Sequence, residues 1–207
     1  MSIHGNKVFR ALTKYQLAAD IEDWGWEIGD YTYGRPLVLE PQLAKLKIGR
    51  FCSIGPDVTF ILGNHRTDTV TTYPFAELKD FWDAPEDLET DHSSKGDIVV
   101  GNDVWFGAGS TILSGAVIGT GAVIGAGAMI RGDIPPYAIV AGNPCRVIRK
   151  RFSDDLITRL LATSWWDWDR DRIRDSLSLL MSGDIEAFLR KAESFSATDH
   201  ARKSPAS

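Results

Sequence analysis

Residues 100–135 read VGNDVWFGAGSTILSGAVIGTGAVIGAGAMIRGDIP, and one class of residue returns at every sixth position of this stretch. The recurring apolar residues are Val100, Phe106, Ile112, Ile118, Ile124 and Ile130. A helix places apolar residues three and four apart, and a half-buried strand places them two apart. A period of six fits neither alone and is typical of a short strand followed by a tight turn, which is the repeat of a parallel β-helix. We therefore predict an all-β solenoid in which three repeats close one coil and stacked coils bury the apolar column.

The same repeat occurs earlier in the chain and is interrupted twice, by an irregular piece over residues 34–47 and by a longer insertion. It begins at Ile28, resumes at residues 48–59, is lost from about residue 62 to 96, and returns near Ile98. An insertion of this length in a regular solenoid is usually functional or disordered. Its aromatic residues favour an ordered flap, and residues 62–96 are called the flap below.

The pattern changes again after the repeats. Leu156, Ile157, Leu160 and Leu161 share one face of a helical period. The sequence predicts an N-terminal lead-in over 1–27, the solenoid over 28–146, a C-terminal α-helical segment over 147–194 and a mobile tail over 195–207.

Composition restricts the class of protein. The chain of 207 residues has a net charge of −5, which argues against nucleic acid or an anionic membrane as the main partner. We find no apolar run long enough for a signal peptide or a membrane span. Cys52 and Cys145 lie far apart without metal-binding spacing, so we predict reduced thiols in a cytoplasmic protein.

Seven segments form a second and more specific pattern. They are residues 28–33 (IGDYTY), 48–55 (IGRFCSIG), 63–68 (GNHRTD), 73–75 (YPF), 98–107 (IVVGNDVWFG), 136–144 (PYAIVAGNP) and 165–168 (WWDW). Together they resemble the hexapeptide-repeat acyltransferases, most closely the xenobiotic acetyltransferase branch that includes chloramphenicol and streptogramin acetyltransferases. The resemblance implies a left-handed parallel β-helix, a homotrimer, and acetyl-CoA bound between neighbouring subunits. It also implies acetyl transfer to a hydroxyl of a small molecule such as an antibiotic-like xenobiotic.

The flap supplies the predicted catalytic residue. The resemblance places a general base at His65, and an imidazole is the usual side chain for that task near neutral pH. Asn64 and Asp68 are predicted to orient His65 or to line the acceptor site, although both residue types also serve in turns. Tyr33 and Phe75 are predicted to contact the acceptor.

The predicted acetyl-CoA site rests on three features. Trp105 precedes the inward Phe106, so it should point outward, and the resemblance places it beside the pantetheine arm. Small residues allow close approach of a ligand to the backbone, where amides can bond it. The predicted contacts of this kind are Gly107, Ala108, Gly125 and Ala126. Arg146, Arg149 and Lys150 are predicted to bind the CoA phosphates, although such charge runs are usually solvated faces.

Two other functions stay open. A sugar or surface-polysaccharide O- or N-acetyltransferase would share the fold, the base and the donor, and a non-catalytic β-helix binding protein would share the fold alone. A zinc-dependent β-helix enzyme needs three imidazoles, and only His65 and His92 lie outside the termini. We therefore predict no metal site.

Overall fold

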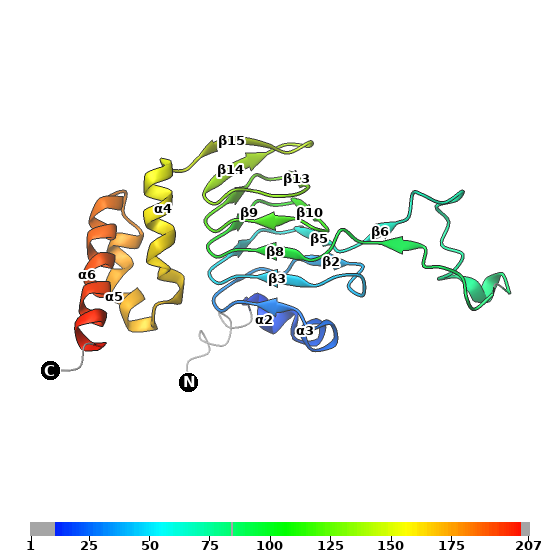
Figure 1. Ribbon diagram of the computed structural model, residues 1–207, viewed down its shortest axis with the longest axis horizontal. Helices are drawn as coiled ribbons and strands as arrows, with labels where there is room; N and C mark the ends of the chain where they lie inside the picture. The colour runs from blue at the N-terminus through cyan, green and yellow to red at the C-terminus, as the bar shows by residue number, and fades with distance from the viewer. Residues whose placement is uncertain (1–10, 84, 204–207) are drawn as a thin grey trace. The chain divides into compact units, whose positions relative to one another are not determined.

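A computed structural model describes residues 11–83 and 85–203, and the chain divides into two compact units, residues 1–151 and 152–207. The first unit contains three sheets of parallel strands, which the chain visits in turn (Figure 1). The β8 sheet holds β1 (Glu27–Ile28), β3 (Leu46–Ile48), β8 (Ile98–Val100) and β11 (Val117–Ile118). The β10 sheet holds β2 (Leu37–Leu39), β5 (Thr59–Ile61), β10 (Thr111–Leu113) and β13 (Met129–Ile130). The β9 sheet holds β4 (Ser53–Ile54), β9 (Trp105–Phe106), β12 (Val123–Ile124), β14 (Ala138–Ala141) and β15 (Arg146–Lys150).

Stacked coils follow from the strand register. Phe106 aligns with Ile54 on one side and with Ile124 on the other, and Ile124 lies three repeats further along the chain. Consecutive strands therefore belong to different sheets, and each strand pairs in parallel with its equivalent in the next coil. This is the arrangement of short parallel strands that the six-residue period predicts.

The core is the predicted apolar column. The recurring residues from Val100 to Ile130 are all at most 4% exposed, and the column continues into the earlier coils through Ile54 and Phe60. The rings of Phe60 and Phe106 meet edge to face with centroids 5.5 Å apart. Small residues such as Ala116, Ala122 and Ala128 are also buried, because a narrow coil accommodates large side chains only beside small ones.

The coils turn at corners, and two of these corners carry or adjoin residues predicted for the site. The chain passes from the β9 sheet to the β10 sheet at residues 107–109 and 125–127, which we call the glycine–alanine corner. It passes from the β10 sheet to the β8 sheet at residues 62–97, 113–115 and 131–133, which we call the flap corner. A Cβ on Gly107 would lie 2.5 Å from the Ala126 nitrogen, so the next coil leaves no room for a side chain there.

The flap is ordered and extends away from the coils (Figure 1). It begins and ends in an antiparallel strand pair, β6 (Asn64–His65) and β7 (His92–Ser93), and contains the 3₁₀ helix η1 (Lys79–Phe81). Tyr73, Phe75 and Trp82 form an aromatic cluster inside it, with ring centroids 4.8 to 6.2 Å apart. The aromatic residues therefore pack against one another, as their number in the sequence suggests.

The segments that flank the solenoid differ in part from prediction. The lead-in contains α2 (Thr13–Gln16) and α3 (Ala18–Trp24), and residues 1–10 lie outside the described part. The predicted boundary at residue 146 falls too early, because β15 pairs antiparallel with β14 and uses the free edge of that strand. The first compact unit consequently reaches Arg151.

The second unit is helical. It contains α4 (Asp154–Thr163), η2 (Trp165–Asp167), α5 (Arg170–Leu180) and α6 (Ile185–Lys203). Ser153 caps α4 by accepting a hydrogen bond from the Leu156 amide. The predicted tail is helical as far as Lys203, and residues 204–207 lie outside the described part. Over residues 11–83 and 85–203, no helix combines the length and apolar character that a membrane crossing requires.

The buried column should dominate stability. Phe106→Ala removes a fully buried ring that contacts Phe60, and we expect it to lower the free energy of unfolding by about 3–5 kcal/mol. Val147→Ala, at a position 54% exposed on β15, is the matched control and should cost less than about 1 kcal/mol. Urea denaturation measures both, and equal losses would contradict the assignment of Phe106 to the core.

Candidate active site

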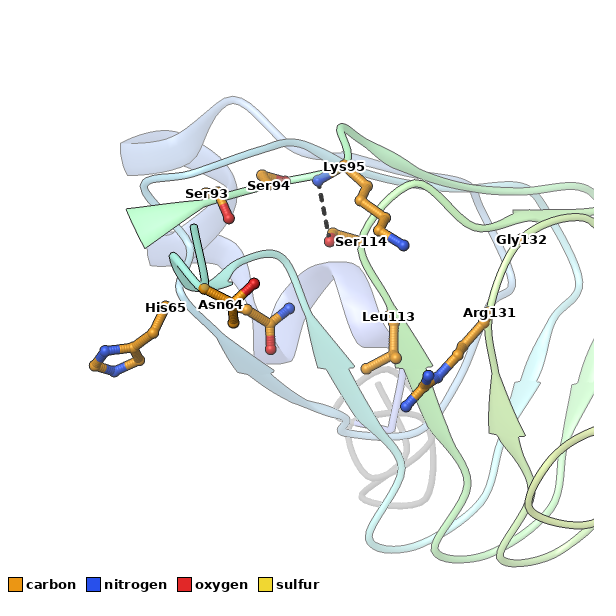
Figure 2. Close-up of a pocket in the computed structure, with 10 residues that line it drawn as sticks. Asn64, His65, Ser93, Ser94, Lys95, Leu113, Ser114, Arg131 and Gly132 are labelled. Atoms are coloured by element: carbon orange, nitrogen blue, oxygen red, sulfur yellow. Dashed lines mark hydrogen bonds between the residues drawn. The ribbon is translucent and has the colours of Figure 1, made fainter. Parts of the chain in front are cut away.

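Asn64 and His65 are neighbours on β6, and their side chains point in opposite directions. In Figure 2 the Asn64 amide faces a cavity at the flap corner, whereas the His65 ring points away from it. This follows from strand geometry, since successive side chains of a strand alternate between its two faces. The flap therefore presents His65 on one side of its stem and Asn64 on the other.

The His65 ring is held by the flap backbone. His65 is exposed, and its Nδ1 lies 2.8 Å from the carbonyl oxygen of Thr72. A carbonyl oxygen can only accept a hydrogen bond, so Nδ1 must donate and carry the proton. In the neutral ring, Nε2 is then the nitrogen with a lone pair, which is the state that a general base needs.

His92 is the cross-strand partner of His65 and was not predicted as a site residue. The two residues are paired in the β6–β7 register, and their ring centroids lie 4.6 Å apart at an angle of 50°. The His92 side chain is only 9% exposed, and its Nε2 lies 3.4 Å from Oε2 of Glu77. The sequence did not predict this pairing, because a long insertion without a period gives no register.

The cavity beside Asn64 has a volume of about 490 Å³. The flap contributes Asn64, His65, Thr67, Ser93, Ser94 and Lys95 to its lining, and the coils contribute Leu113, Ser114, Arg131 and Gly132. The Lys95 amide donates to Ser114 Oγ at 3.2 Å, which joins the flap to the next coil (Figure 2). None of the described residues that line the cavity is acidic, while Lys95 and Arg131 are cationic.

Lys95 and Arg131 were missed by the sequence analysis, although a signal was present. Lys95, Leu113 and Arg131 are each three repeats apart. Positions three repeats apart stack at the same corner of successive coils. Extending the six-residue period through the end of the flap would have placed these two cations at the same corner, with Leu113 of the intervening coil between them.

Asp68 and Phe75 are engaged within the flap. Asp68 accepts two hydrogen bonds from the Arg66 guanidinium, at 3.0 and 3.1 Å, and this hydrogen-bonded charge lowers the pKa of its carboxyl group. Arg66 also binds Glu89 at 2.8 Å and so connects the two limbs of the flap. Phe75 belongs to the aromatic cluster and is 37% exposed. Asp68 therefore contributes to holding the flap together, and Phe75 packs inside the aromatic cluster.

Trp105 faces outward, as predicted, and is 56% exposed. It aligns with Ser53 in the preceding coil and with Val123 in the next, and Tyr33 pairs with Ser53. Tyr33 and Trp105 therefore lie in one row on the outer face of the β9 sheet. This sheet borders the glycine–alanine corner and does not border the flap corner.

The glycine–alanine corner contains the predicted small residues. The amides of Gly107 and Gly125 donate to the carbonyl oxygens of Ile124 and Val140, at 2.7 and 2.8 Å. Both amides are thus engaged between coils, contrary to the expectation that they would bond a ligand. Ala108 and Ala126 are exposed at the turn and stack one above the other, since the amide of Gly127 donates to the Ala108 carbonyl.

The predicted basic cluster lies on β15. Arg146, Arg149 and Lys150 are all exposed on this strand. The neighbouring Arg151 has a different environment: its Nη1 donates to the Gly121 carbonyl at 2.8 Å and lies 3.7 Å from Asp103 Oδ2. Burial raises the pKa of the Asp103 carboxyl group despite this arginine. Arg151 therefore fastens the end of the solenoid to the coils beneath it.

One chain assembles only part of the predicted site. The flap corner brings Asn64, Lys95, Ser114 and Arg131 around one cavity, and His65 borders that cavity from the stem with its ring pointing away. Trp105, Ala108 and Ala126 lie on another sheet and at another corner. Among the residues that the structure describes, no three His, Cys, Asp or Glu side chains form a group suited to a metal ion.

Known proteins share both the repeat and most of the chain. Residues 97–132 match the family model described as bacterial transferase hexapeptide (six repeats). A chloramphenicol acetyltransferase of Agrobacterium fabrum is 43% identical over 70% of this chain and 71% of its own length. A probable macrolide acetyltransferase of Lysinibacillus sphaericus is 44% identical over 71% of this chain and 83% of its own length. A virginiamycin A acetyltransferase of Staphylococcus aureus is 47% identical over 71% of this chain and 68% of its own length.

These relatives are named for transfer of an acetyl group to three chemically different antibiotics, and each aligns over more than two thirds of both chains. Such identity over such a length is incompatible with a likeness confined to the repeat. The chain belongs to the hexapeptide-repeat acetyltransferases, in the branch that contains the chloramphenicol, macrolide and virginiamycin acetyltransferases.

Proposed function

We propose that this enzyme transfers the acetyl group of acetyl-CoA to a hydroxyl of a small antibiotic-like molecule, with His65 as the general base. The observation that carries this proposal is the contact between His65 Nδ1 and the Thr72 carbonyl, which leaves Nε2 as the basic nitrogen. The names of the relatives support the acceptor class. The assay of thiol release with several antibiotics, described below, serves to identify the acceptor.

The reaction needs only one proton carrier. His65 Nε2 takes the proton of the acceptor hydroxyl while its oxygen attacks the thioester carbonyl of acetyl-CoA. The tetrahedral intermediate collapses when the carbon–sulfur bond breaks, and the imidazolium returns the proton to the departing CoA sulfur. The products are the acetyl ester and free CoA, and the base is restored for the next cycle.

The fold in this proposal is a left-handed parallel β-helix that assembles as a homotrimer. Family membership supports this arrangement, and so does the distribution of the predicted residues over two corners of one chain. Several apolar residues on the outer faces would be covered in a closed ring. They are Leu37, Leu39, Val99 and Val117, each at least 37% exposed. The acetyl-CoA cleft would then lie between the flap of one subunit and the Trp105 face of its neighbour.

Two groups of cations are candidates for the CoA phosphates. Arg149 and Lys150 lie on β15, and Lys95 and Arg131 line the cavity at the flap corner. Guanidinium and ammonium groups both bind phosphate well. The sequence analysis favours the β15 pair, and the cavity pair provides the comparison that tests it.

Loss of the base should slow chemistry and preserve binding. We expect His65→Ala to lower kcat by about 10²–10⁴-fold, the usual contribution of a positioned general base, while the KM for acetyl-CoA stays nearly constant. Thiol release from acetyl-CoA, with chloramphenicol, a macrolide and a streptogramin as acceptors, measures both constants. The assignment of His65 fails if the variant keeps more than about a tenth of the wild-type kcat.

Loss of a phosphate contact should act on the donor alone. We expect Arg149→Ala with Lys150→Ala to raise the KM for acetyl-CoA about tenfold, equivalent to about 1.4 kcal/mol of binding, and to leave the acceptor KM unchanged. The difference from wild type should shrink at high salt. If Lys95→Ala with Arg131→Ala has this effect and the β15 pair has none, the phosphates bind at the flap corner.

Mixed trimers test whether the site is shared between subunits. His65→Ala and Trp105→Ala should each be nearly inactive, and we expect activity to return when the two proteins are unfolded together and refolded at equal amounts. About a quarter of the sites would then combine an intact His65 with an intact Trp105 from the next subunit. If both residues act from one chain, every site in the mixture is defective and no activity returns.

A further inference from the structure

His92 and Glu77 connect to His65 through a continuous series of contacts in the flap. The amide of Glu77 donates to Oδ2 of Asp91 at 2.8 Å, which fixes residue 77 beside the start of β7. The Glu77 carboxylate reaches Nε2 of His92 at 3.4 Å, and the His92 ring lies against the His65 ring with centroids 4.6 Å apart. At the other edge, the His65 ring bonds the Thr72 carbonyl.

A single hydrogen bond does not fix an exposed imidazole. With only the Thr72 contact, rotation about the Cα–Cβ and Cβ–Cγ bonds of His65 can break this one bond and turn Nε2 in other directions. The His92 ring, tilted by 50° against the His65 ring with centroids 4.6 Å apart, restricts that rotation. His92 suits this task because it is almost fully buried and held by Glu77, whereas His65 is exposed.

We propose that His92 is a positioning residue for His65, held in turn by Glu77. This inference rests on the proposed role of His65 as the general base. His92 does not exchange a proton with substrate; it keeps His65 Nε2 aimed at the acceptor hydroxyl. Small errors in the placement of a catalytic group cost large factors in rate, so the effect of losing His92 should appear in kcat.

The first experiment is a double-mutant cycle. We expect His92→Ala to lower kcat between about tenfold and a hundredfold, with the KM for acetyl-CoA within about twofold of wild type. His92→Phe keeps a flat ring at the same cross-strand position but loses the contact with Glu77, so it should restore only part of kcat. In a His65→Ala background, His92→Ala should cause no further loss, because there is no ring left to position.

Three results of this cycle would overturn the proposal. One is a His92→Ala kcat within about twofold of wild type. A second is an equal loss in the presence and absence of His65, which would mean that His92 acts by itself. A third is failure of His92→Phe to recover any activity while its KM values remain those of wild type.

The second experiment does not depend on catalysis. Two-bond ¹H–¹⁵N spectra of the histidine rings report which nitrogen of His65 carries the proton. We expect the Nδ1-protonated form in the wild type and in His92→Phe, and a mixture of tautomers in His92→Ala. An unchanged tautomer in His92→Ala would overturn the positioning role. If His65→Ala remained active, the general-base proposal would fail, yet this measurement would still decide whether His92 orders the ring.

Discussion

The structure depends on one packing constraint, which is that every coil must close on a column of large side chains with almost no space at its corners. The buried residues that recur every six positions alternate with small ones, and their strands stay in register from coil to coil. At the corners, the backbones of neighbouring coils lie in close contact, as those of Gly107 and Ala126 do. Extra chain therefore cannot enter a strand without moving the whole column off its register. It can leave only at a corner, and the flap does so between β5 and β8.

This constraint explains how much of the fold could be predicted. A six-residue period reports burial directly, so the core residues and the parallel strands were predicted correctly from sequence. The end of the solenoid was not, because β15 pairs antiparallel and all its residues are exposed. A strand without a buried face leaves no apolar period to detect. The helical continuation beyond residue 195 was missed for a related reason, since its polar sequence resembles a tail.

The candidate site was likewise predictable from sequence only in part. His65 was assigned through resemblance to a family, and the contact with Thr72 then gives a physical reason for its suitability. The pairing of His65 with His92 spans most of an irregular insertion, and no periodicity defines such a register. Lys95 and Arg131 were within reach of prediction, because they occupy equivalent corner positions of the repeat. The engagement of the Gly107 and Gly125 amides between coils was not, because sequence gives the identity of a small residue and not the direction of its N–H.

The closed stem of the flap has an evolutionary consequence. Its two ends are paired through β6 and β7, and Arg66 bridges the limbs just beyond that pair. Only the stem of the flap therefore constrains the coils. The entropic cost of closing a loop grows only slowly with its length, so the length of the tip has little effect on the solenoid. The tip can lengthen, shorten or change sequence while the solenoid folds as before. A scaffold of this kind allows one surface loop to diverge without any change in the coils that carry it.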